Sequence, residues 1–83
     1  MSNTTWPDLT ADAQATICRA VRKALETGGE STTFGVVHRL AIGKPRRDVP
    51  THIVQSALET MLADGRVTVS AGPRWVEMWR VVK

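Results

Sequence analysis

The fold of this chain is decided by residues 49–67, which read VPTHIVQSALETMLADGRV. Apolar side chains recur there at the three- and four-residue spacing that places them on one face of a helix. Pro50 suits the first turn of that helix, where its missing N–H costs no hydrogen bond, and Asp48 has a side chain able to act as the N-cap. Gly65 fits the left-handed conformation in which helices often end. We therefore predict a helix with a buried stripe formed by Val54, Ala57, Leu58, Met61 and Leu62.

The opposite face of this helix is polar, and most of its side chains carry no charge. Hydroxyl and amide groups can pair with base edges in the DNA major groove, and a glutamine amide can make two bonds to adenine. The candidate base-reading residues are Thr51, His52, Gln55 and Ser56. Glu59 lies toward the far end of this face, where phosphate would repel it. The alternative for each candidate is an ordinary solvated helix face.

Six residues of this stretch carry a resemblance to a known family. They are Val54, Ala57, Leu58, Met61, Gly65 and Val67. Together they resemble the third-helix signature of winged helix-turn-helix domains, in which the recognition helix runs through a glycine into the hairpin called the wing. The resemblance implies an α+β fold of three helices and a C-terminal two-stranded hairpin. It also implies DNA binding or, as in some members, a protein-interaction role.

The sequence before this stretch predicts two further helices. An apolar stripe with helical spacing follows Thr10, a suitable N-cap, and ends at residues 28–29, which are both glycine. Residues 30–33 could form a short strand or bridge. The inner face of a second helix would hold Phe34, Val36 or Val37, Leu40 and Ala41. Glycine and proline then predict a turn over residues 43–48.

The sequence after the stretch predicts the hairpin. Alternating apolar residues indicate strands at residues 66–70 and 75–82, joined by a turn at residues 71–74. Trp75 and Trp79 would then share a face of the second strand, with Trp79 in the core. We assign residues 1–9 to an N-terminal arm, in which Trp6 could dock on the body, and residues 10–83 to the winged helix domain.

Composition narrows the range of partners. A chain of 83 residues allows one small domain, and its net charge of +3 favours a polyanionic partner. The single cysteine, Cys18, excludes a disulfide within the chain and fits a reducing compartment. The first residues lack the pattern of a secretory signal, and no apolar run reaches transmembrane length. We therefore expect a cytoplasmic protein that does not enter a membrane.

The basic excess is concentrated just before the predicted recognition helix. Lys44, Arg46 and Arg47 lie in the turn that leads into it, where basic groups could hold phosphate oxygens. Arg74, in the predicted hairpin turn, could reach a neighbouring phosphate or the minor groove. The alternatives are a solvated loop for the first three residues and an ordinary hairpin turn for Arg74.

Catalysis and metal binding are not expected. His38 and His52 belong to different helices and lack the spacing of metal ligands, and Cys18 sits beside an apolar stripe as a small hydrophobic side chain. The chain has no glycine-rich phosphate loop, because its only glycine pair ends a helix. We predict no enzyme activity, no cofactor and no metal.

These observations predict sequence-selective binding of double-stranded DNA by a small transcriptional regulator. A homodimer is possible, through the first helix, the arm with Trp6, or the last strand, because one small module reads few bases. The alternative is an adaptor or inhibitor that binds another protein, since three tryptophans are many for so short a chain. Left-handed duplex is disfavoured, because winged helices that bind it use a tyrosine and this chain has none.

Overall fold

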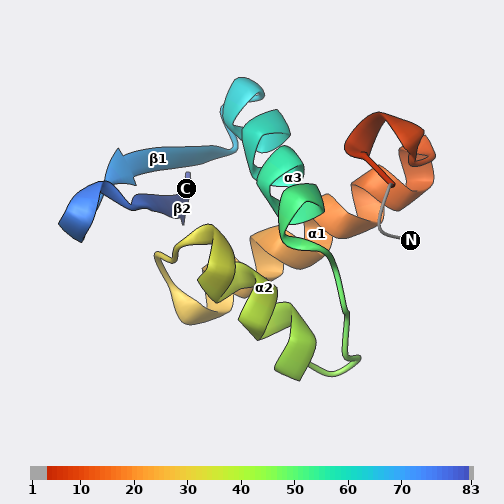
Figure 1. The fold of residues 1–83 in the computed structure, drawn as a ribbon, viewed down its shortest axis with the longest axis horizontal. Helices are drawn as coiled ribbons and strands as arrows, with labels where there is room; N and C mark the ends of the chain where they lie inside the picture. Colours follow the sequence, from red (N-terminus) through yellow and green to blue (C-terminus); the bar gives the residue numbers. More distant parts are fainter. Residues whose placement is uncertain (1–3, 83) are drawn as a thin grey trace.

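The computed structural model describes residues 4–82 as three helices followed by an antiparallel hairpin (Figure 1). The helices are α1, Ala11–Gly28; α2, Thr33–Ile42; and α3, Thr51–Ala63. The strands are β1, Val67–Ala71, and β2, Glu77–Val81, and single 3-10 turns stand at Trp6–Asp8 (η1) and Pro73–Trp75 (η2). This α+β layout is consistent with the winged-helix architecture, so the predicted fold class is confirmed.

The core lies where the three helices meet the inner face of the hairpin. Each helix contacts the other two, and β2 contacts α1 and α2. The largest fully buried side chains are Trp79, Leu58, Met61, Val21, Val36, Val54 and Val67. Complete burial of one such side chain contributes about 1.5–3 kcal/mol, so this small set supplies much of what holds the domain together.

The first two helices begin at threonine caps. Thr10 Oγ1 accepts a hydrogen bond from the Ala13 N–H at 3.1 Å, which confirms the predicted N-cap of α1. Thr32 caps α2 in the same way. Gly35 lies in the first turn of α2, close to the buried Ser31, and a Cβ at this position would clash with the Ser31 hydroxyl oxygen. The close approach of Ser31 to the backbone of α2 therefore explains why a glycine occupies position 35 inside the helix.

The prediction that Phe34 faces inward is wrong. Its side chain is 74% exposed, whereas Val36 and Leu40 are buried. Residues two apart on a helix lie about 200° apart around its axis, so Phe34 must point away once Val36 points in. Of the alternatives Val36 and Val37, the former is fully buried and the latter half-buried.

Helix α3 forms where predicted, but its start and its buried stripe differ in detail. The helix begins after Pro50, whose carbonyl accepts from Ile53 and Val54, and it has no side-chain cap. Asp48 is not the cap, because the N-cap is Pro50, which was expected in the first turn; the Asp48 carboxylate lies 3.2 Å from Arg46 Nε. Two corrections concern the stripe: Ile53 is buried and Leu62 is 39% exposed.

The helix end and the hairpin follow from backbone conformation. Gly65 has a φ of 73°, the left-handed conformation that the sequence predicts. β1 and β2 then pair in the register Val67 with Val81 and Val69 with Trp79. Ser31 forms an isolated bridge with Trp79, which confirms the short bridge expected over residues 30–33.

The prediction that Trp75 belongs to the second strand is wrong. Trp75 lies in η2, is 88% exposed and has a φ of 63°, and its neighbour Arg74 has a φ of 59°. Two consecutive left-handed residues reverse the chain before β2 begins at Glu77. Trp79, by contrast, is 1% exposed and belongs to the core, as predicted.

The described part of the arm lies against the body. Trp6 packs against the core while half exposed, and its carbonyl accepts from the Gln14 side chain at 2.8 Å. Residues 1–3 of the predicted arm, and Lys83, lie outside the described residues. Within residues 4–82, none of the helices combines the length and the apolar character needed to cross a membrane.

Candidate nucleic-acid interface

Three of the four predicted base-reading residues line one hollow at the N-terminal end of α3. We call it the α3 hollow; its walls come from α2, α3 and the segment that enters β2. It is lined by Thr33, Phe34, Thr51, His52, Gln55, Val76 and Glu77. Ser56, the fourth predicted residue, is half-buried and does not line this hollow.

Gln55 is held in place by a chain of hydrogen bonds that begins in the core. The indole N–H of the buried Trp79 donates to Thr33 Oγ1 at 3.1 Å. The Thr33 hydroxyl in turn donates to Gln55 Oε1 at 2.7 Å. This series of hydrogen bonds uses only one lone pair of the Gln55 oxygen and does not involve the amide nitrogen. The side chain is therefore oriented from the core, and its amide N–H groups and second oxygen lone pair can still pair with an adenine edge.

His52 is exposed and is bonded to the arm. Its Nε2 lies 2.6 Å from the carbonyl oxygen of Thr4. A carbonyl oxygen only accepts, so Nε2 carries the proton in this contact. A base edge in front of α3 would therefore meet a His52 ring whose Nε2 proton already has an acceptor, and the arm would have to release it before Nε2 could donate to a base.

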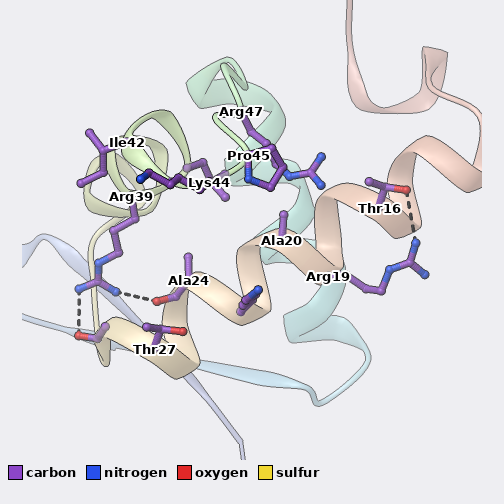
Figure 2. A pocket seen from close by; sticks show the side chains of 14 residues that line it. Thr16, Arg19, Ala20, Ala24, Thr27, Arg39, Ile42, Lys44, Pro45 and Arg47 are labelled. Carbon is purple, nitrogen blue, oxygen red and sulfur yellow. Dashed lines mark hydrogen bonds between the residues drawn. The ribbon is translucent and has the colours of Figure 1, made fainter.

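The predicted phosphate-binding residues Lys44, Arg46 and Arg47 are all exposed on the loop between α2 and α3. The loop is tied back to α2, because the Arg47 N–H donates to the Leu40 carbonyl at 2.8 Å. Arg46 forms an ion pair with Asp48. Lys44 and Arg47 line a groove that lies between α1 and α2 (Figure 2). The fourth candidate, Arg74, is exposed in η2 at the hairpin turn.

The groove of about 630 Å³ is lined by fourteen residues, and we call it the basic groove. Its cations come from α1, α2 and the loop: Arg19, Lys23, Arg39, Lys44 and Arg47. None of its lining residues is acidic. The three ion pairs within residues 4–82 involve Arg22, Arg46 and Arg66, so none of the five groove cations forms a direct ion pair in this part of the chain.

One of the five groove cations has a structural task. The Arg39 guanidinium donates to the carbonyls of Ala24, Gly28 and Gly29 at 2.8–3.2 Å, and Figure 2 draws two of these bonds. These carbonyls lie at the C-terminal end of α1, where helices leave acceptors unpaired and where a cation is favoured. Arg39 therefore satisfies the end of α1 and links it to α2.

Sequence reasoning missed two parts of this surface. Arg19 and Lys23 were not among the predicted site residues, although their four-residue spacing puts them on one side of the first helix. Phe34 was expected on the inner face of the second helix, and Trp75 and Val76 were expected within the second strand. All three side chains are exposed. Helical spacing could have indicated the pair on α1; nothing local could have indicated the exposed apolar residues.

The structure also places Cys18 and the side chains that could ligate a metal. Burial raises the pKa of the Cys18 thiol, which lowers its thiolate fraction and hence its reactivity at neutral pH. No three metal-ligating side chains lie close enough together within residues 4–82 to hold an ion.

Comparison of the chain with protein-family models, with curated proteins and with solved structures gave no significant match.

Proposed function

We propose that this chain binds duplex DNA through α3 and acts as a small cytoplasmic transcriptional regulator of the winged helix-turn-helix class, without catalysis. What carries the proposal is the charge at the start of α3. Lys44, Arg46 and Arg47 are exposed on the loop that leads into it. Its N-cap, Pro50, offers no side-chain acceptor, and its first turn contains no acidic residue.

The contrast with α1 supports this assignment. At the start of α1, a threonine hydroxyl caps the helix and Asp12 lies in the first turn, so the positive end of the helix dipole is compensated. At the start of α3, the dipole is left uncompensated beside a basic loop. Phosphate groups bind well where backbone N–H groups and basic side chains converge. Thr51, His52 and Gln55 would then face the bases.

A salt series tests the proposal. Binding of labelled random-sequence duplex would be measured by fluorescence anisotropy between low and moderate salt. For a protein that contacts several phosphates, log affinity should fall linearly with log salt, with a slope near −0.9 per contact. Selection from a random library should then yield an enriched site. Absence of binding at the lowest salt would refute DNA binding, and binding without enrichment would refute sequence selectivity.

A second candidate function is protein binding, and one observation favours it. Phe34 and Val76 line the α3 hollow and are 74% and 44% exposed, and Trp75, next in the chain to Val76, is 88% exposed. Clustered apolar side chains on a surface mark interaction sites, and tryptophan is enriched at their centres. The partner would be a second copy of the chain or a different protein, and either would cover the hollow that the first proposal assigns to the bases.

Sedimentation separates these partners. A homodimer through this surface should dissociate when Phe34 and Trp75 are both replaced by serine. A wild-type chain that is monomeric at high concentration and binds no DNA would favour a different protein as the partner.

A further inference from the structure

We infer that the basic groove is a binding site for a small amphipathic organic anion, one with a single anionic head group and an apolar body. The proposal concerns a site separate from the α3 hollow, since the two share no lining residue. The argument rests on the charge, the floor and the size of the groove.

The charge of the groove defines the head group. Four cations, Arg19, Lys23, Lys44 and Arg47, line it in addition to the structurally engaged Arg39. No acidic residue lines it, and no carboxylate within residues 4–82 pairs with these side chains. In Figure 2, Arg47 extends from the loop, whereas Arg19 extends from α1 toward Thr16, whose hydroxyl accepts from Arg19 Nη2 at 3.4 Å. Like charges held around one concavity favour an anion between them.

The floor of the groove defines the body of the ligand. Between the cations, the lining is apolar: Ala20 and Ala24 of α1, and Leu40, Ile42 and Pro45 from α2 and the loop. Ile42 is 67% exposed and has no place in the core. The two alanines are one helical turn apart, so their small side chains leave room beside α1. An apolar ligand surface would cover Ile42 and these alanines.

The size of the groove favours a small molecule. Its volume of about 630 Å³ lies within the range of about 300–1,000 Å³ that ligand sites occupy. It runs along α1 from Thr16 to Gly28, which at 1.5 Å per residue is about 18 Å. A groove of that length and volume has room for a small molecule with a head group and an extended or planar body.

The site shares two cations with the proposed DNA interface. Lys44 and Arg47 line the basic groove and also belong to the loop that would contact phosphate. A bound anion would neutralise them and reduce the attraction for DNA. This coupling, unlike the site itself, rests on the proposed function. It would make the chain a regulator whose DNA affinity depends on a small ligand.

Anilinonaphthalene sulfonate is a suitable probe, since it combines one sulfonate with an apolar aromatic body and fluoresces when bound. N-phenylnaphthylamine, which lacks the sulfonate, is the matched uncharged probe. Both would be titrated against the full chain. We expect the sulfonate to bind at a single site at least about tenfold more tightly, because a hydrogen bond to a charged group is typically worth that factor. No binding, or equal affinity for both probes, would overturn the proposal.

Charge-matched variants locate the site. Arg19→Gln with Lys23→Gln should weaken sulfonate binding about tenfold or more. Arg22→Gln with Arg80→Gln removes the same charge from exposed residues outside the groove and should change it less than about twofold. Equal weakening by both pairs would reduce the effect to net charge and refute the site.

The apolar contact is tested in the same way. Ile42→Gln should weaken binding, whereas Val82→Gln, at an exposed apolar residue outside the groove, should not. Amide NMR spectra should show probe-induced shifts at Ala20, Ala24 and Ile42. Shifts confined to Phe34, Trp75 and Val76 would place the probe on the other apolar surface and refute the proposal.

A final measurement tests the coupling. Saturating probe should lower the affinity of the wild-type chain for duplex DNA and should lose this effect in Arg19→Gln with Lys23→Gln. If DNA binds equally well with and without probe, the coupling is refuted and the site stands. If the chain binds no DNA while the probe still binds the groove, the proposed function fails alone.

Discussion

The α3 hollow and the basic groove lie at opposite ends of α2 and differ in almost every physical property. The N-terminal end of α2 contributes Thr33 and Phe34 to the hollow, where hydroxyl, amide and apolar groups stand beside one acid, Glu77. Its C-terminal half contributes Leu40 and Ile42 to the groove, where five cations stand without an acid. In the hollow, hydrogen bonds from the core orient Gln55, whereas the groove combines cations, of which Arg39 is held by three hydrogen bonds, with small apolar side chains. A single short helix thus separates a surface suited to reading shape and hydrogen bonds from one suited to holding an anion.

The largest expected effect is the loss of stability on replacing Trp79, the buried residue beneath the hollow. Trp79→Ala removes a fully buried indole and also the donor that orients Thr33 and Gln55. The free energy of unfolding should fall by about 3–5 kcal/mol, measured by chemical denaturation. Trp75→Ala, at a residue 88% exposed, should change it by less than about 0.5 kcal/mol. Similar losses for the two tryptophans would mean that the hairpin is wrongly placed.

The next effect concerns the cations that the two surfaces share. Arg47→Gln should weaken DNA binding by roughly 1.5–3 kcal/mol and reduce the salt slope by about one, because one phosphate contact is lost. The same change should weaken binding of the sulfonate probe in the basic groove. Arg19→Gln, which alters only the groove, should weaken the probe and leave DNA binding within about twofold. If both variants impair DNA binding equally, the phosphate surface extends over α1 and the division between the surfaces is lost.

A smaller and more selective effect is expected at Gln55. Gln55→Ala should cost about 1–3 kcal/mol at a preferred DNA site and little on random duplex, because phosphate contacts carry non-specific binding. The loss of the Thr33–Gln55 hydrogen bond should lower stability by about 0.5–1.5 kcal/mol. Thr33→Val is the comparison variant: it keeps the Gln55 amide and removes the same hydrogen bond, together with the acceptor of the Trp79 indole N–H. An equal affinity loss in both variants would show that orientation, rather than base contact, is what Gln55 provides.

The smallest effect on stability is expected at the apolar rim of the hollow. Phe34→Ser should change the free energy of unfolding by less than about 0.5 kcal/mol, because the side chain is 74% exposed. A change in self-association, measured by sedimentation, would assign this rim to a homodimer. Stabilisation by more than about 1 kcal/mol would instead mean that Phe34 is strained in the folded chain, which contradicts its open position.

The sequence by itself determined the elements. Caps such as Thr10, helix ends such as Gly65 and the periodicity of α1 and α3 depend on residues within a few positions of one another, and these predictions agree with the structure. The basic turn was also evident, because its cations are consecutive or nearly so. Local rules failed where one helix face had to be chosen against another, as at Phe34. They also failed where two left-handed residues delayed the start of the second strand, as at Trp75.

Only the tertiary structure decided which side chains act together. The hydrogen bonds that orient Gln55 join residues 22 and 46 positions apart, and no sequence spacing indicates them. The basic groove exists because α1 packs against the C-terminal half of α2, which brings Lys23 to the same concavity as Lys44. The burial of Ile53 in place of Leu62 was set by how α3 meets its neighbours. Periodicity fixes which residues share a helix face, but the direction in which that face turns depends on packing between segments that are distant in the chain.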